Sequence, residues 1–121
     1  MTSQEVFDLI VEHLRAQKSR SIRTVRYWTR DEIEPALHGD EGKRCPAGLF
    51  IQEEEYDAKL MEGYSFGSFL AMKEAPQRMK DEFSEHAALI DACVFLHDFT
   101  EPERWEEELK SIASQFGLKL A

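Results

Sequence analysis

Apolar side chains recur at helical spacing over the first seventeen residues of the chain. Positions three and four apart fall on one side of a helix drawn over residues 3–17. They are Val6, Leu9, Ile10, His13, Leu14 and Gln17. Thr2 precedes Glu5 by three positions, which is the spacing of a capping box. The pattern therefore predicts an amphipathic helix over 3–17.

Two further periodic stretches occupy the second half of the chain. The longer one covers residues 77–97 and places apolar and histidine side chains on one side. They are Met79, Phe83, His86, Ile90, Cys93, Val94 and His97, with Leu89 and Leu96 beside them. The other begins at Thr100, whose hydroxyl can cap a helix together with Glu103, and is expected to end at Gly117. Its predicted buried face is Trp105, Leu109, Ile112, Ala113 and Phe116.

Residues 19–34 carry two conflicting patterns. Apolar residues at every third position suit a helix; they are Ile22, Val25 and Trp28. The same segment is rich in β-branched and aromatic residues, which favours a strand. We predict a short strand at about 24–29. The loop 35–44, which holds proline and glycine, then closes a β-hairpin within 24–45.

Three short helices are expected between the hairpin and the longest periodic stretch, over 46–55, 57–62 and 65–73. Pro46 suits a first helical turn, where its missing N–H has no partner to lose. Gly48 costs a helix interior roughly 1 kcal/mol relative to alanine. We therefore expect another backbone to approach Gly48 closely.

These elements predict the fold class. The chain is expected to be a mainly α protein, with one small domain over 1–121, about five helices and at most one short β-hairpin. The core is expected to form from the helices over 3–17 and 77–97 and the C-terminal helix. The Cys45 segment would be wedged among them.

Composition adds expectations about the cellular setting. Hydrophobic residues make up 42% of the chain and charged residues 32%. No run approaches the roughly 20 apolar residues that a membrane span needs, and residues 2–5 lack the features of a secretory signal. We therefore expect a cytoplasmic protein with reduced thiols, and a Cys45–Cys93 disulfide is the less favoured alternative.

The net charge of −9 is unevenly distributed. Residues 1–44 hold eight basic and eight acidic side chains, whereas residues 45–121 hold seven basic and sixteen acidic ones. An acidic body repels the phosphate backbone. Direct nucleic-acid binding is therefore not expected.

One basic strip nevertheless stands out, formed by Arg20, Arg23, Arg26 and Arg30. Tyr27 and Trp28 lie within the strip, an arrangement that can contact phosphates and stack on bases. The alternative is a solvated face, or one that pairs with the protein's own acidic residues. The overall charge favours this alternative.

Two acidic clusters are candidate partner-binding surfaces. The first consists of Glu53, Glu54, Glu55 and Asp57, with Glu62 nearby. The second consists of Glu103, Glu106 and Glu107, with Glu101 and Glu108 beside them. Each cluster is either a solvated helix face or a surface complementary to a basic partner. No paired carboxylates and no glycine-rich phosphate loop stand out as catalytic machinery.

Cys45 is a candidate reactive thiol. At the start of a helix, beside Lys43 and Arg44, its pKa is expected to be lowered, which would make it a nucleophile or a redox switch. The favoured alternative is a small buried residue that leads into a packed turn. No histidine and Asn or Asp partner scheme is evident around it.

His86, Cys93 and His97 share one helical face. Cys93 and His97, one turn apart, could grip zinc, but Cys45 would have to complete the site from elsewhere. Because this is the apolar core face, we favour histidines that are hydrogen-bonded within the core. The pair His97-Asp98 is too small for a metal phosphohydrolase site, and Asp98 fits a helix junction better. No metal or cofactor is expected.

The segment around Cys45 resembles a known family. Its pattern is Lys43-Arg44-Cys45-x-x-Gly48-x-x-Ile51, then Tyr56, then Met61-Glu62-Gly63. The pattern is similar to that of small uncharacterised proteins encoded by phages, prophages and related mobile elements. Leu96-His97-Asp98 and the C-terminal helix also resemble that family. The chain departs from it over 29–42, which is longer and more acidic, and at Pro46.

The resemblance offers no catalytic residues. Together with the charge, it implies a small acidic non-enzymatic interaction protein in the host cytoplasm. Such a protein would bind and inhibit a host protein with a basic surface, for example a defence or nucleic-acid-binding protein. The alternative is a thiol-dependent or small-ligand-binding protein centred on Cys45.

Overall fold

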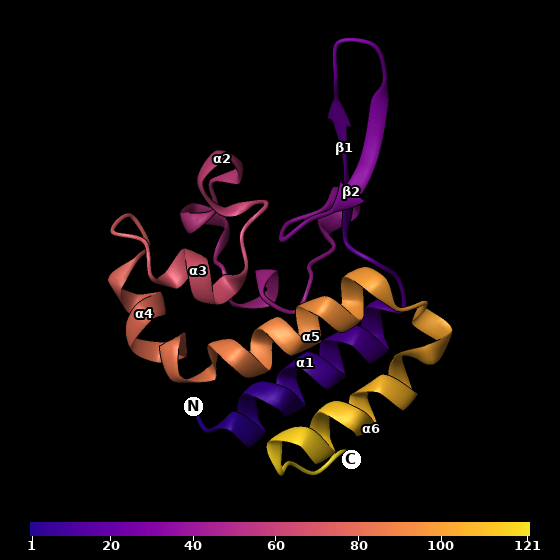
Figure 1. Ribbon diagram of the computed structural model, residues 1–121, viewed down its shortest axis with the longest axis vertical. Coiled ribbons are helices and arrows are strands. Elements are labelled where there is room, and N and C mark those ends of the chain that lie inside the picture. Colours follow the sequence, from indigo (N-terminus) through magenta and orange to yellow (C-terminus); the bar gives the residue numbers. More distant parts are fainter.

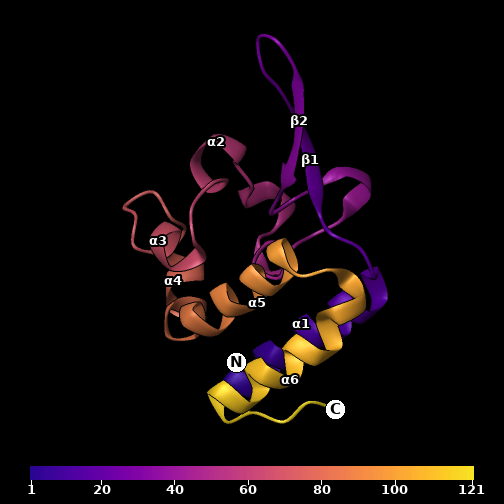
Figure 2. The ribbon, with the colours of Figure 1, turned by 45° about the vertical axis from the view of Figure 1, so that its right-hand side comes forward.

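Three helices form the body of the molecule. The computed structural model describes all 121 residues. Helices α1 (Ser3–Gln17), α5 (Ala87–Phe99) and α6 (Trp105–Phe116) lie side by side (Figures 1 and 2). The predicted capping box starts α1, where the Thr2 hydroxyl accepts from the Glu5 N–H and the Glu5 carboxylate accepts from the Thr2 N–H. The predicted helix over 3–17 is confirmed.

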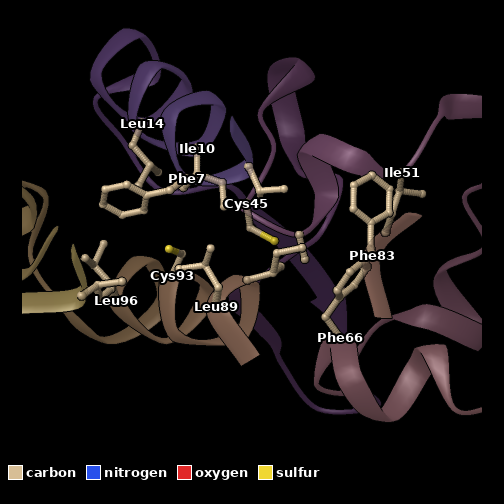
Figure 3. Packing of buried hydrophobic residues seen from close by; sticks show 14 of the residues in the cluster. Phe7, Ile10, Leu14, Cys45, Ile51, Phe66, Phe83, Leu89, Cys93 and Leu96 are labelled. Atoms are coloured by element: carbon tan, nitrogen blue, oxygen red, sulfur yellow. The ribbon is translucent and has the colours of Figure 1, made fainter. Parts of the chain in front are cut away.

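One hydrophobic core of 23 buried residues joins these helices to the middle of the chain. Figure 3 shows Cys45 pointing into this core between Phe7 and Ile10 of α1 and Leu89 of α5. Farther along, the core continues through Ile51, Phe66 and Phe83. The predicted position of the Cys45 segment, among the main helices, is confirmed.

The predicted hairpin is present and extends away from the helices (Figure 1). Strands β1 (Ile22–Arg26) and β2 (Asp31–Pro35) are antiparallel, and Thr24 lies opposite Ile33. The predicted strand at 24–29 is therefore misplaced, because the turn lies at residues 27–30 and not in the loop 35–44. This turn contains neither glycine nor proline, so it gave no turn signal in the sequence.

The glycines of the loop 35–44 serve a second, smaller turn at the base of the hairpin. His38 and Arg44 form an isolated antiparallel bridge. The Gly39 N–H donates to the Lys43 carbonyl at 2.9 Å. The turn signals in this loop were therefore real, but they mark a different turn.

The predicted helix over 46–55 is wrong. Two short 3-10 turns, Gly48–Phe50 and Glu53–Glu55, replace it. The explanation for Gly48 is confirmed, because a Cβ at that position would lie 1.8 Å from the carbonyl oxygen of Leu37. The chain cannot continue as a regular helix here while it presses against the backbone of residue 37.

The next two predicted helices are present but shorter. Helix α2 (Ala58–Met61) is capped by Asp57, and helix α3 (Phe66–Leu70) is capped by Ser65. The fold is thus mainly helical with one two-stranded hairpin, as predicted. None of the helices combines the length and the apolar character that crossing a bilayer requires.

The predicted helix over 77–97 is divided in two. Helix α4 (Gln77–Phe83) ends in a 3-10 turn, Ser84–His86, before α5 begins. At the break the ring of His86 lies 2.8 Å from the Met1 carbonyl oxygen and 3.1 Å from the Ser3 hydroxyl. Because α4 and α5 bury the same core, the apolar pattern continues through the break and does not reveal it.

The final helix begins later than predicted. Thr100 does not cap it, because a 3-10 turn over Pro102–Arg104 comes first and α6 starts at Trp105. The carbonyl of Thr100 accepts instead from the Trp105 indole N–H at 3.0 Å. Gly117 ends α6 with a φ of 66°, as predicted.

Candidate functional site

The hairpin, residues 22–35, is called the arm from here on. Its tip carries Trp28, which is fully exposed at 101%. Tyr27 and Ile33 are also exposed, at 50% and 70%. A two-stranded hairpin has little stability of its own, because it has no sheet or helix to cover its faces. The arm therefore depends on its base for its position.

The base of the arm is hydrogen-bonded to the C-terminal end of α5. The Ser21 N–H donates to His97 Nε2 at 2.8 Å, and the Ala36 N–H donates to the Ser21 carbonyl at 3.0 Å. The Arg20 guanidinium donates to the carbonyls of His97 and Thr100 at 3.1 and 2.9 Å. These bonds fix the direction in which the arm leaves the body.

His97 is a structural residue at this junction. Because Nε2 accepts from a backbone N–H, the ring proton sits on Nδ1, which lies 2.6 Å from Asp98 Oδ1. The ring also stacks on Trp105, with centroids 5.7 Å apart. Both ring nitrogens of His97 are thus engaged within the protein, and no group of three or more His, Cys, Asp or Glu side chains is placed to hold a metal ion.

The basic strip pairs mainly with acidic residues of the same arm. Ion pairs link Arg23 to Glu34 at 2.9 Å, Arg30 to Glu32 at 2.7 Å, and Arg26 to Asp31 at 3.9 Å. Arg20 lies at the base and contacts α5. Internal pairing, part of the favoured alternative, describes these arginines. The partners of Arg23, Arg26 and Arg30 come from strand β2, whereas Arg20 lies 4.0 Å from Glu101 in the acidic part of the chain.

The first acidic cluster is largely engaged within the protein. Arg44 pairs with Glu53, and Arg78 lies 2.5 Å from Glu55 and lowers the pKa of that carboxyl. Asp57 accepts from the Lys59 N–H at the start of α2. Glu54 is exposed and makes no ion pair.

The second acidic cluster is anchored elsewhere. Glu106 accepts from Nε and Nη2 of the Arg15 guanidinium of α1, at 2.6 and 2.9 Å, and this contact lowers the pKa of Glu106. Glu107 lies 3.6 Å from Arg104, and Glu103 is exposed. Different parts of the body thus hold the two clusters, and their role in binding a partner stays a prediction.

The favoured prediction for Cys45, a small buried residue, is confirmed, and the less favoured interpretation, a reactive thiol with a lowered pKa, is wrong. Its side chain is 2% exposed, and burial raises the pKa of the thiol to about 12. Cys93 is also buried, with its pKa raised to about 12 by the same cause. Both cysteines are free thiols. Desolvation of the thiolate outweighs the nearby basic residues of the sequence, so Cys45 is a packing residue.

A groove with a volume of about 550 Å³ lies between the base of the arm, the segment 63–65 and α5. Three aromatic side chains line it and are exposed: Tyr64 at 52%, Phe95 at 66% and Phe99 at 72%. The rings of Phe95 and Phe99 are 4.8 Å apart. The groove thus has an aromatic rim on the side of α5 that faces away from the core.

Carboxylates dominate the charge of the groove. It is lined by four of them and by one basic residue; they are Glu34, Glu62, Asp91, Asp98 and Arg23. The oxygens of Asp91 accept from the N–H groups of Phe66 and Gly67 at 2.7 and 3.0 Å. Hydrogen bonds of this kind position a carboxylate without cancelling its charge, so the groove is negative.

Glu62 is held by the residues that follow the arm. Its two oxygens each lie 3.0 Å from the Leu37 nitrogen, whose N–H they accept, and one also accepts from the Tyr56 hydroxyl at 2.5 Å. Burial and the neighbouring Glu62 raise the pKa of Tyr56, so this hydroxyl keeps its proton. The motif residues Tyr56 and Glu62 thus act together in fixing one wall of the groove.

Sequence reasoning did not find the groove, although a signal for it exists. Helix α5 is apolar on nearly all sides, which is typical of a helix that is covered all round. On one side of α5, Ala88, Phe95 and Phe99 are exposed, and Ala92, at helical spacing between them, is half-buried against the core. An uncovered apolar stripe on such a helix indicates a contact outside the chain.

The fold and the site define a small, mainly helical domain with a projecting hairpin and an acidic, aromatic-rimmed groove at its base. No protein-family model, no curated protein and no solved structure matches the chain. Function is therefore inferred from the arm, the groove and the charge.

Proposed function

We propose that the protein is a non-enzymatic interaction protein that binds a partner protein with the arm. The main support for this proposal is the full exposure of Trp28. Tryptophan, tyrosine and arginine are the residues that most often dominate binding energy at protein interfaces. The side chains of Trp28, Tyr27 and Arg26 stand apart from the core, so folding of the body does not explain their presence at the tip.

The proposed partner is a host protein with a basic surface. The net charge of −9 supports this choice, since opposite charge speeds association and selects partners. In the same proposal, the acidic body occupies a surface on which the partner would bind phosphates, as a defence or nucleic-acid-binding protein does. Binding would then inhibit that partner.

Direct nucleic-acid binding by the arm is the second candidate function. Exposed Tyr27 and Trp28 beside Arg26 and Arg30 favour it, because aromatic rings stack on bases and arginines contact phosphates. Against it, both arginines already face carboxylates of β2, and the body would repel phosphates. The thiol-centred alternative loses support because the Cys45 thiol is buried and has a raised pKa.

A capture experiment tests the proposal. The tagged wild type, Trp28→Ala and the control Leu9→Ala are incubated with host-cell extract, and the bound proteins are identified by mass spectrometry. Leu9 is a suitable control, since it is 42% exposed and lies on α1, outside the arm. We expect a defined partner whose capture falls about tenfold or more with Trp28→Ala, the scale of an interface hot spot, but persists with Leu9→Ala.

Two results would count against the proposal. One is a partner that binds Trp28→Ala as well as the wild type, which would remove the arm from the interface. The other is quenching of Trp28 fluorescence by a single-stranded oligonucleotide at physiological salt, which would favour the nucleic-acid candidate instead.

A further inference from the structure

We propose that the groove beside the arm binds a short basic segment of the partner, with a lysine or arginine side chain set between the aromatic rim and the carboxylates. This inference rests on the proposed function, because it assigns a second contact to the same partner. The proposed occupant is an apolar peptide segment that carries a cation.

The first step is that the aromatic rim is uncovered. Phe95 and Phe99 belong to a helix that buries Leu89, Ile90, Cys93 and Leu96 in the core, yet they are 66% and 72% exposed. Tyr64 faces the same groove and is half exposed. Three exposed aromatic side chains around one groove are more than the scattered apolar residues of an ordinary surface.

The second step is that charge selects the occupant. The one basic residue in the groove, Arg23, is already paired with Glu34 at 2.9 Å. Asp98 faces the ring of His97, which is neutral in the tautomer that accepts from Ser21, so the Asp98 charge has no cationic partner there. The groove therefore keeps an excess of negative charge that a cation would balance.

The exposed aromatic rim and the unbalanced carboxylates favour the same occupant. A cation beside an aromatic face is attracted by the ring, and a nearby carboxylate strengthens its binding. A purely apolar segment would cover the carboxylates without pairing them, which is unfavourable. An acidic segment would be repelled. Among peptide segments, only a basic one satisfies both the rim and the carboxylates.

The fourth step is continuity with the arm. Arg23 and Glu34 belong to the arm and also line the groove. A partner that binds the arm therefore already lies beside the groove. A volume of about 550 Å³ suits a few side chains of a peptide segment, within the range of small binding sites.

A peptide selection tests the inference. A displayed library of random twelve-residue peptides is selected on the immobilised wild type. Enriched peptides are then measured for binding to Phe99→Ser, Phe95→Ser and Glu34→Gln. Glu34 is the carboxylate to change because it hydrogen-bonds the Arg23 side chain, whereas Glu62 and Asp91 hold backbone groups.

Matched controls separate the groove from the rest of the surface. Leu9→Ser removes an exposed apolar side chain elsewhere, and Glu54→Gln removes an exposed carboxylate that makes no ion pair. Thermal melting followed by circular dichroism checks that each variant is folded. If Phe99→Ser does not fold, Glu34→Gln and Phe95→Ser still decide the matter.

We expect enriched peptides to contain lysine or arginine beside apolar residues. Their affinity should fall about tenfold with Phe99→Ser and severalfold with Glu34→Gln, and should fall with added salt. The controls should bind as the wild type does. Acidic peptides, peptides indifferent to the groove variants, or no enrichment would each overturn the inference.

The outcome also separates this inference from the proposed function. If partner capture depends on Trp28 while no peptide depends on the groove, the groove inference fails and the proposed function stands. If peptide binding depends on the groove while partner capture is unchanged by Trp28→Ala, the proposed role of the arm is wrong and the groove inference is retained.

Discussion

At Gly48 the chain passes against another part of its own backbone. A side chain of any size there would meet the Leu37 carbonyl, with a Cβ 1.8 Å from that oxygen. Gly48→Ala must therefore displace backbone, and we expect it to lower the free energy of unfolding by about 3 kcal/mol or more.

Urea denaturation followed by circular dichroism measures this loss. The matched control is Gly42→Ala, where a Cβ meets nothing within 4 Å but φ is +74°. Its cost should be only about 1–2 kcal/mol, the strain of a left-handed residue. Equal losses for the two variants would contradict the close approach.

Because its two thiols are buried, we expect the protein to lose stability in alkali. Burial raises the pKa of Cys45 and Cys93 in the folded protein to about 12, above the ordinary thiol value of 9.0. Stability from the neutral thiols is therefore fully present below about pH 9 and is lost as pH rises toward 12. The unfolded chain releases its thiol protons first, which favours unfolding.

The variant Cys45→Ala/Cys93→Ala tests this directly. Between pH 8 and pH 11, each thiol should cost the wild type on the order of 2 kcal/mol that the double variant does not lose. The measurement is urea denaturation at both pH values. Equal pH dependence in the two proteins would show that the thiols are not buried as described. Iodoacetamide should accordingly label the native wild type very slowly at pH 7.

Residue chemistry was the hardest part to predict from sequence. The neighbours Lys43 and Arg44 correctly indicate a basic environment for Cys45, but burial depends on α1 and α5, which lie far away along the chain. Gly48 was different, because a glycine in an unfavourable position already indicates close backbone approach. The burial of Cys45 was the favoured prediction, because free cysteines are usually buried, but the residues that bury it could not be read from the sequence.

At the scale of elements, His97 joins the arm to α5. We expect His97→Phe to leave the Ser21 N–H without its acceptor and to lower the free energy of unfolding by about 1–3 kcal/mol. Hydrogen exchange should show reduced protection of the Ser21 amide in this variant. Retained protection would mean that the arm is held by other contacts.

Asp98→Asn is the matched control for His97→Phe. The asparagine oxygen can still accept from Nδ1, so the ring keeps its tautomer and Nε2 stays an acceptor for Ser21. Ser21 protection should therefore remain close to that of the wild type. Loss of protection in both variants would mean that the negative charge of Asp98, and not only its hydrogen bond, orients the His97 ring.

Helices were predictable where one face is buried and a local cap marks the start. Helix α1 has both signals and begins and ends where expected. The break between α4 and α5 was hidden, because the apolar pattern runs through it and the bonds of His86 to the N-terminal residues are long-range. The first strand of the arm was predicted to start two residues late, and its turn was predicted in the loop 35–44, since the actual turn at 27–30 has no glycine or proline.

At the scale of the whole molecule, one core connects the helices with the Cys45 segment. Because its 23 buried residues form a single cluster, we expect one cooperative unfolding transition. In Trp28→Phe the buried Trp105 is the only tryptophan, so its fluorescence reports on the core. Urea transitions followed by fluorescence and by far-ultraviolet circular dichroism should coincide.

Separate transitions would mean that the middle of the chain unfolds independently of the helices. Trp28→Phe should itself change the free energy of unfolding by no more than about 0.5 kcal/mol, as expected for a surface substitution away from structural features. The arm and the body are thus separable in their roles, since the body supplies stability and the arm supplies contact surface.

Fold class could be predicted for the whole molecule, and Tyr27 and Trp28 of the arm tip already stood out in the sequence, but the groove could not be predicted. The acidic clusters around Glu53 and Glu106 attracted attention in the sequence, yet arginines of the protein's own body hold both. The groove depends on the arm, on the segment 63–65 and on α5 meeting at one place. No short stretch of the sequence shows that these three segments lie together.

Photo-cross-linking shows whether the tip of the arm contacts a partner protein. A photoreactive phenylalanine analogue replaces Trp28 in one protein and exposed Leu9 in another, and both are irradiated in host-cell extract. We expect a discrete covalent adduct with one protein from position 28 and none from position 9. No adduct at position 28, or the same adducts from both positions, would contradict it.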